Sequence, residues 1–191
     1  MRNPYPHIAG IAVGVTLLSL FVTLPVRLMW NASASVPGGL YAIAPARTLH
    51  RGDLAVVDPT PEIAELLAER SYLPRGVPLL KYVAATGGQR VCRVDLRITI
   101  AGKTVGMARR RDRKDRLLPE WQGCFQLIDG DLFLMNIAVA DSLDGRYFGV
   151  LAAARVVGRA TPIWTRERGD GRYVWRAEPL SKSPAFPTQG D

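Results

Sequence analysis

The sequence predicts a mainly β domain that follows one N-terminal membrane-spanning helix. Two observations predict this architecture: an uncharged apolar run from Ile8 to Val26, and short β-type runs bounded by Pro and Gly that recur as far as Trp164. With 191 residues, 48% of them hydrophobic, the chain has room for one packed domain and an anchor.

The apolar run from Ile8 to Val26 is long enough to cross a bilayer. As a helix it would span about 28 Å, against a hydrocarbon core of about 30 Å. A cleavable signal peptide is the alternative, because Ala32-Ser33-Ala34 has the small-x-small form of a cleavage site. The run exceeds the usual ~7 to 15 apolar residues of such peptides. We therefore predict an uncleaved anchor over residues 1–30, with an orientation that the flanking arginines do not decide.

The elements after the anchor follow from local patterns. Leu40 to Ile43 and Leu54 to Val57 are β-type runs, and a helix is expected from Pro61 until Pro74 and Gly76 stop it. Further β-type runs lie at Val77–Ala85, Val91–Ile100, Leu132–Asn136 and Arg155–Trp164. The domain is predicted over residues 31–168. A Gly-, Pro- and charge-rich tail, expected to be poorly ordered, occupies residues 169–191.

The formal charge of +8 is concentrated in one place. Residues 109–116 contain six cations and two anions, and the rest of the chain is only mildly basic. No aromatic residue interrupts this run, so a solvated loop is the common explanation and a nucleic-acid partner is not predicted.

Two cysteines, Cys92 and Cys124, are present. They are either paired in an oxidising compartment or reduced and structural. With His7 and His50 isolated from them, no metal site is predicted.

The stretch from Asn31 to Tyr41 changes composition abruptly after the apolar run. Ser33 and Ser35 are followed by Pro37, Gly38 and Gly39. Such a backbone is extended and then sharply turned, which can expose a serine, and residues two apart in an extended chain face the same side. Taken alone, the stretch would be interpreted as a linker.

Lys81 interrupts the apolar run from Val77 to Ala85. Strand alternation places it on the face of Leu79 and Val83, although an exposed strand lysine is the ordinary interpretation of such a pattern. If that face is buried, desolvation would lower the pKa of the amine from about 10.4 by up to ~3 to 5 units. A serine nucleophile without a His/Asp pair needs a base of this kind.

A third segment, Ser142-x-Asp144-x-Arg146-Tyr147-Phe148-Gly149, completes a pattern. Ser35-Val36-Pro37 after an anchor, Lys81 before Thr86-Gly87-Gly88, and this segment resemble the type I signal peptidase superfamily in the same order. General signal peptidases carry Gly-Asp-Asn-Arg before the last motif, whereas Met135–Ala140 stands here. This difference favours the conjugative-transfer, TraF-type branch.

Other segments are similar to that branch as well. They are Asn31-x-Ser33-x-Ser35-Val36-Pro37-x-Gly39-Leu40-Tyr41, Gly52-Asp53-Leu54, Tyr72-Leu73-Pro74-x-Gly76-Val77-Pro78-Leu79-Leu80-Lys81 and Leu118-Pro119-x-Trp121-x-Gly123-Cys124.

The resemblance implies a role for each matching residue. Ser35 would be the nucleophile and Lys81 its general base. The Ser33 hydroxyl and the Ser35 backbone N–H would form the oxyanion hole. Ser142 would orient the lysine, and Asp144 with Arg146 would support the site. The resemblance to the TraF-type branch leaves open whether Asp144 is structural or acts more directly.

The resemblance also implies an overall organisation. We expect an antiparallel β core, a cap insertion at roughly 90–130 bounded by a Cys92–Cys124 disulfide, and no cofactor or metal. The protein would span the inner membrane once and face the periplasm.

The implied function is a Ser/Lys serine endopeptidase that processes, and in this branch can cyclise, a conjugative pilin precursor. Its partners would be that substrate, the membrane and proteins of the transfer apparatus. A general type I signal peptidase and a non-catalytic, membrane-anchored subunit of a conjugation or secretion apparatus are the alternatives.

Overall fold

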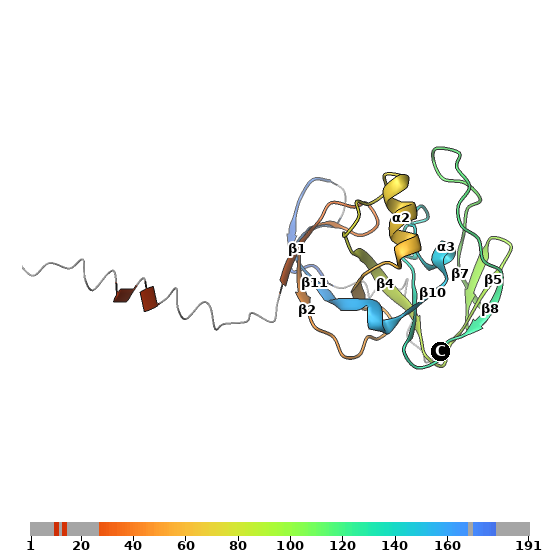
Figure 1. Cartoon of the computed structure of the whole chain (residues 1–191), viewed down its shortest axis with the longest axis horizontal. Coiled ribbons are helices and arrows are strands. Elements are labelled where there is room, and N and C mark those ends of the chain that lie inside the picture. Colours follow the sequence, from red (N-terminus) through yellow and green to blue (C-terminus); the bar gives the residue numbers. More distant parts are fainter. Residues whose placement is uncertain (1–9, 12, 15–26, 168–169, 179–191) are drawn as a thin grey trace, which may run out of the picture.

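The computed structural model describes residues 10–11, 13–14, 27–167 and 170–178. Strands dominate these ranges, and every strand pairing within them is antiparallel, so the predicted mainly β class is confirmed (Figure 1). The elements are β1 (Arg27–Asn31), β2 (Gly38–Ala44), β3 (Leu54–Val57), α2 (Pro61–Glu69), β4 (Leu79–Thr86), β5 (Arg90–Val94), β6 (Arg97–Ile100), β7 (Lys103–Met107), β8 (Gly123–Gln126), β9 (Asp131–Leu134), α3 (Gly145–Phe148), β10 (Val150–Ala152), the 3₁₀ turn η1 (Ala153–Arg155), β11 (Val156–Arg166) and β12 (Val174–Trp175).

The larger sheet has the strand order β1-β2-β11-β3-β4-β9-β10, with β12 paired to β11. Strand β4 lies inside this sheet, between β3 and β9. The close approach of β2 to β11 requires a glycine at position 39, because a Cβ there would lie 2.3 Å from the carbonyl oxygen of Trp164. The sheet therefore holds the residues after Ser35 firmly against the domain.

The smaller sheet, which we call the cap, has the strand order β7-β6-β5-β8. Cys92 of β5 faces Cys124 of β8 in register, and the two form a disulfide with an S–S distance of 2.05 Å. The predicted single run from Val91 to Ile100 is wrong. A turn at Asp95, whose φ is +54°, splits it into the hairpin β5–β6, and aspartate adopts this conformation more readily than most residues.

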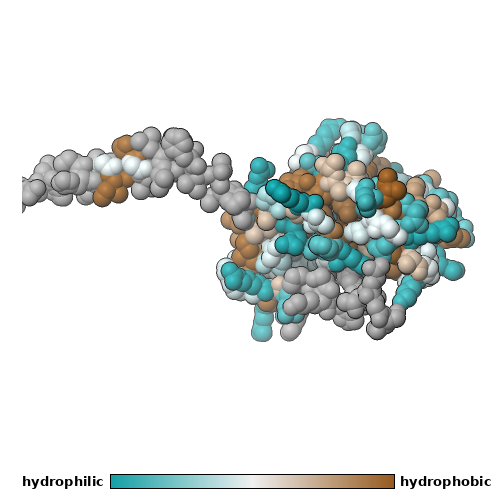
Figure 2. Space-filling model, turned by 90° about the horizontal axis from the view of Figure 1, so that it is seen from below, coloured by the Kyte–Doolittle hydropathy of each residue, from teal (hydrophilic) through white to brown (hydrophobic). Residues whose placement is uncertain are grey.

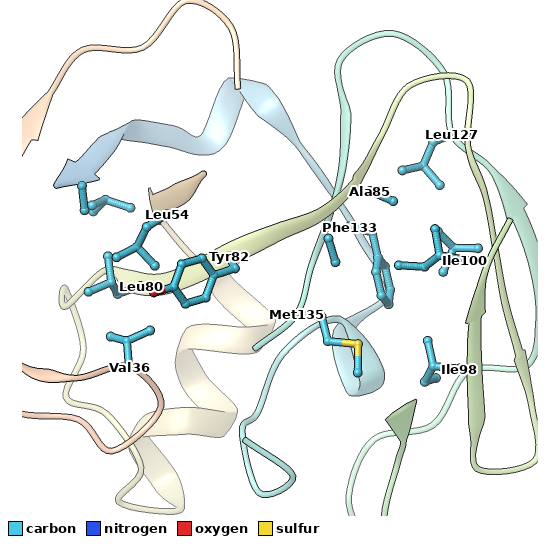
Figure 3. Packing of buried hydrophobic residues seen from close by; sticks show 14 of the residues in the cluster. Val36, Leu54, Leu80, Tyr82, Ala85, Ile98, Ile100, Leu127, Phe133 and Met135 are labelled. Carbon is cyan, nitrogen blue, oxygen red and sulfur yellow. The ribbon is translucent and has the colours of Figure 1, made fainter. Parts of the chain in front are cut away.

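One apolar core connects the two sheets. Figure 3 shows Val36, next to the candidate nucleophile, packed near Leu80 and Tyr82 of β4, while Ile98 and Ile100 of the cap lie beyond Phe133 and Met135. Phe133 and Met135 are fully buried. Burying such side chains stabilises the fold by about 1.5–3 kcal/mol each, so the cap and the larger sheet share their main source of stability.

Helix α2 begins where the sequence predicts. Pro61 is its first residue, and the side chain of Thr60 accepts a hydrogen bond from the Ile63 backbone N–H (3.4 Å). The helix ends at Glu69, before the predicted stop at Pro74, because the chain turns at Ser71 with a φ of +56°. Leu67 is its buried anchor on the domain.

The predicted membrane-spanning helix over Ile8–Val26 lies largely outside the described residues. In the parts of the chain that are described, no helix combines the length and apolarity needed to cross a bilayer. The predicted tail begins with β12, which pairs with Trp164 and Thr165 of β11, and residues 179–191 lie outside the described ranges. On the face seen in Figure 2, apolar and hydrophilic residues are interspersed over the domain surface.

Candidate active site

Ser33 and Ser35 lie on the short loop between β1 and β2, and Asn31 holds that loop in shape. The Asn31 side-chain oxygen accepts hydrogen bonds from the Ser33 backbone N–H (3.0 Å) and from the Ser33 hydroxyl (2.8 Å), and its amide donates to the carbonyl of Val36 (3.1 Å). The two serine hydroxyls lie 3.3 Å apart. Ser35 is half-buried and Ser33 exposed, and the chain turns at residues 34–35, so a turn, and not the expected strand alternation, brings the two hydroxyls together.

Lys81 lies in the middle of β4, opposite Ala55 of β3, and is only 4% exposed. The interpretation of the strand pattern alone, an exposed lysine, is therefore wrong. Its amine donates a hydrogen bond of 2.9 Å to the hydroxyl of Ser142. Burial lowers the pKa of Lys81 from 10.5 to about 8, an effect that Asp144 opposes and Arg146 reinforces. Near that pH a substantial fraction of the amine is neutral.

Ser142 is positioned by a tightly bonded segment that ends in α3. The Asp144 carboxylate accepts hydrogen bonds from the Arg146 backbone N–H (3.1 Å) and side chain (2.9 and 2.8 Å), and both side chains are almost fully buried. The Arg146 guanidinium also donates to the carbonyls of Ala140 (3.1 Å) and Val139 (2.6 Å). These bonds fix the turn that carries Ser142.

Asn136 is a residue that the sequence reasoning did not single out as part of the site. Its amide donates to the Ser35 carbonyl (2.7 Å), and its side-chain oxygen accepts from the Tyr82 backbone N–H (3.0 Å). Its backbone N–H donates to Asp144 (3.0 Å). Through its side chain and its backbone N–H, this one buried residue joins the loop of the candidate nucleophile, the strand of the candidate base and the supporting ion pair.

Arg93 of β5 was also missed. It is 1% exposed, and its guanidinium donates to the Arg146 carbonyl (2.7 Å). Trp121 donates through its indole N–H to the Gly145 carbonyl (2.9 Å). These bonds tie the cap and the chain before β8 to α3. In the sequence, the available signal was an arginine two positions after Val91 in a β-type run, but its partner is 53 residues away.

A cavity of about 400 Å³ brings these groups together. Ser33, Ser35, Lys81 and Ser142 all line it, beside apolar side chains that include Leu79 and Leu80. Ser35 bonds Ser33 and Lys81 bonds Ser142, so each hydroxyl and the amine already have a polar partner on the cavity wall. A hydroxyl, a buried amine with a lowered pKa and a second hydroxyl suit nucleophilic attack assisted by a general base. Among the described residues, no group of three or more metal-binding side chains is present.

Comparison with known proteins gives a consistent result. The family described as signal peptidase, peptidase S26, matches residues 4–165. The conjugal transfer protein TraF of Agrobacterium fabrum (strain C58 / ATCC 33970) is 31% identical over 170 residues, covering 83% of this chain and 92% of that protein. The conjugal transfer protein TraF of Agrobacterium tumefaciens (strain 15955) is 33% identical over 177 residues, covering 86% and 97%.

Among solved structures, that of a signal peptidase I from Enterococcus faecalis V583 is 19% identical with a TM-score of 0.35, covering 59% of this chain and 97% of that one. The family match over residues 4–165 and the two TraF relatives decide the assignment: the chain belongs to the signal peptidase S26 family and, within it, to the TraF-type conjugal transfer proteins.

Proposed function

We propose that the protein is a membrane-anchored serine endopeptidase with a Ser35/Lys81 dyad that processes a pilin precursor for conjugation. The observation that carries the proposal is the buried Lys81 amine, with its lowered pKa, in the same cavity as Ser35. A buried amine without a bonded carboxylate is costly, and such a cost is usually retained for chemistry. The catalytic domain would face the periplasm, next to an anchor that ends before Arg27, because Arg27–Asn31 form β1 of the larger sheet.

The chemistry follows from the groups in the cavity. The Ser35 hydroxyl attacks the scissile carbonyl carbon while the neutral Lys81 amine takes its proton. The Ser33 hydroxyl and the Ser35 backbone N–H stabilise the oxyanion, for which Ser33 turns its proton away from Asn31. The ammonium of Lys81 then protonates the leaving amine, which gives an acyl-enzyme on Ser35.

The acyl-enzyme has two routes to product. Attack by water gives a trimmed linear chain. Attack by the amino terminus of the same pilin gives a cyclic chain, whose mass is lower than that of the linear chain by one water. The TraF-type relatives, named as conjugal transfer proteins, motivate the pilin as substrate. Ser142 orients the base, and Asp144 acts on position and not on protons, because its oxygens are already occupied by donors from Arg146 and Asn136.

Mass spectrometry of a candidate pilin precursor co-expressed with the full-length protein tests the proposal. The wild type should yield a shortened pilin. A cyclic product would be lighter than the linear product by the mass of one water. Ser35→Ala and Lys81→Ala should each yield only the precursor. The exposed cap variant Arg97→Gln serves as the matched control and should process normally. Processing that survives both active-site substitutions would instead indicate a non-catalytic subunit.

A general signal peptidase is distinguished in the same experiment. An enzyme of that kind would also shorten an unrelated secreted precursor when the two are co-expressed. The TraF-type enzyme should leave that precursor intact.

A further inference from the structure

Two cavities meet at Ser35 and Ser142. The first, described above, has a largely apolar wall that includes Leu67, Val77 and Leu80. We call it the apolar cavity. The second has a volume of about 570 Å³ and shares Ser35 and Ser142 with the first. The reacting centre therefore lies where two spaces join that differ in the charge of their walls, since Lys81 and Asp141 are the charged residues that line the first.

The second cavity, which we call the basic cavity, is walled by the loop between β7 and β8, by residues 138–143 and by the chain just after α2. Its wall contains six basic side chains and two carboxylates, Asp112 and Asp141. Asp115 pairs with Arg111 (3.5 Å) and reduces the excess of positive charge to three. The basic side chains are Arg70, Arg109, Arg111, Arg113, Lys114 and Arg116.

The carboxylates in this wall are already occupied by cations of the same wall. Asp141, next to Ser142 in sequence, pairs with Arg109 (2.7 Å) and with Arg113. Asp112 pairs with Arg116 (2.7 Å). Within residues 27–167, Arg70 and Lys114 form no salt bridge, and Arg70 donates to the Leu117 carbonyl (2.7 Å) instead. The surplus charge is thus free to meet an anion from outside the chain.

We propose that the basic cavity is a subsite for an acidic stretch of the peptide substrate, on the opposite side of the scissile bond from apolar residues that occupy the apolar cavity. This rests on the proposed peptidase function. The occupant is the reacting chain itself, because Ser35 and Ser142 belong to the walls of both cavities. The charged loop, which the sequence pattern explains as merely solvated, becomes the source of charge selectivity.

Binding of synthetic peptides to the full-length Ser35→Ala protein in a non-ionic detergent tests the subsite without any need for cleavage. Each peptide joins a short Ala/Val half to a half that contains three Glu, in either order, and each has a partner in which Gln replaces Glu. In one of the two orders, the Glu peptide should bind roughly threefold to tenfold more tightly than its Gln partner, by fluorescence anisotropy. Salt at about 0.5 M should abolish the difference, because it screens exposed charges.

Two double substitutions locate the effect. Arg111→Gln with Lys114→Gln, introduced into the Ser35→Ala protein, removes two exposed cations of the basic cavity and should abolish the preference for Glu. Arg97→Gln with Lys103→Gln removes the same charge from exposed cap positions outside the cavity wall and should preserve it. Equal binding of Glu and Gln peptides, or equal loss in both doubles, would overturn the subsite.

Binding of the protein to vesicles that contain phosphatidylglycerol tests whether the basic cavity binds the membrane instead. If the Arg111/Lys114 double lowers vesicle binding but leaves the peptide preference intact, the basic cavity serves the membrane and the proposal fails. Cleavage of the same peptides by the protein with Ser35 intact separates the two proposals. A binding preference without any cleavage would contradict the peptidase, whereas cleavage that ignores charge would contradict only the subsite.

Discussion

Strand β4 and the segment from Asn136 to Arg146 each bury a cation, but the two cations differ in their bonding partners. Within the described residues, the Lys81 amine of β4 donates to one neutral group, the hydroxyl of Ser142. Arg146 has two bonds to the Asp144 carboxylate and further bonds to carbonyls of its own segment. The two cations are 4% and 1% exposed, so burial alone does not distinguish them.

The difference separates a group that changes protonation from a group that holds position. Desolvation, which the charge of Asp144 opposes only in part, lowers the pKa of Lys81 to about 8. Desolvation alone would lower the pKa of Arg146, but the hydrogen bond and charge of Asp144, together with Tyr147 and Asp141, raise it overall, and a guanidinium stays charged in any case. A fixed ion pair thus builds the turn on which the proton-accepting amine depends.

The largest effect is expected from exchanging one kind of cation for the other at position 81. Lys81→Arg should lower the cleavage rate by about 10²- to 10⁴-fold, because a guanidinium cannot serve as a general base. Peptide or pilin cleavage measured from pH 6 to pH 10 checks this, with circular dichroism to verify folding. Near-normal activity of Lys81→Arg would overturn the dyad and leave Ser35 without its base.

Methionine at the two positions should change stability in opposite directions. Arg146→Met leaves the Asp144 carboxylate buried and unpaired and should reduce the free energy of unfolding by about 3–5 kcal/mol. Lys81→Met removes a buried ammonium at pH 7 and should raise the free energy of unfolding by on the order of 1–3 kcal/mol. Chemical denaturation of both variants measures the two changes.

The pH dependence of these two variants sharpens the test. Because the pKa of Lys81 is about 8 when folded and 10.5 ordinarily, the unfolded chain binds the extra proton between those values, and wild-type stability should rise with pH across that window. Lys81→Met should lack this rise. If Lys81→Met were the less stable protein at pH 7, burial of the amine would carry no cost and the comparison would fail.

The link between the two regions is Asn136, and its loss should have an intermediate effect. Asn136→Asp keeps an acceptor for the Tyr82 N–H but, when ionised, cannot donate to the Ser35 carbonyl, so kcat should fall by roughly 10- to 100-fold. KM should change little, since the residue lies behind the loop. Steady-state kinetics measures the two separately. A change confined to KM would mean that Asn136 shapes the substrate cavity and does not position the nucleophile.

How far the sequence predicts this arrangement depends on the range of the interactions. Local patterns locate β3 at Leu54–Val57 and the start of α2 at Pro61, because turn and cap residues act on their near neighbours. The burial of Lys81 is not predicted by its strand pattern. It results from the pairing of β4 with both β3 and β9, and the β9 residues lie about 50 positions further along the chain.

The roles of Asn136 and Arg93 escape sequence reasoning for the same reason. The Asn136 amide bonds a carbonyl 101 residues earlier, and Arg93 bonds one 53 residues later. Neither residue stands out in the sequence, because its bonding partner is distant along the chain and becomes a neighbour only in the folded structure. The segment with Ser142, Asp144 and Arg146 was recognised through its resemblance to a family. The bonds of Asp144 and Arg146 within that segment close within ten residues, whereas the bond from Lys81 to Ser142 spans 61.

The smallest expected effect concerns the one hydrogen bond that Lys81 makes to Ser142. In the wild type, activity should rise with pH through about 8, because the neutral amine is the active form. A hydroxyl that accepts from the amine stabilises the ammonium more than the neutral form. Ser142→Ala should therefore move the midpoint of the pH–rate profile below that of the wild type, by less than about one pH unit.

The height of the profile separates this electrostatic role from a purely structural one. Ser142→Ala should also lower the plateau at high pH, because the amine loses its orienting bond, whereas Ser142→Thr keeps a hydroxyl and should retain most of the wild-type midpoint. The pH–rate profiles of the three proteins, measured at saturating peptide, give both quantities. A midpoint that is identical in Ser142→Ala and the wild type would mean that the group titrating near pH 8 is not Lys81. The buried amine of β4 would then be as fixed in its charge as Arg146.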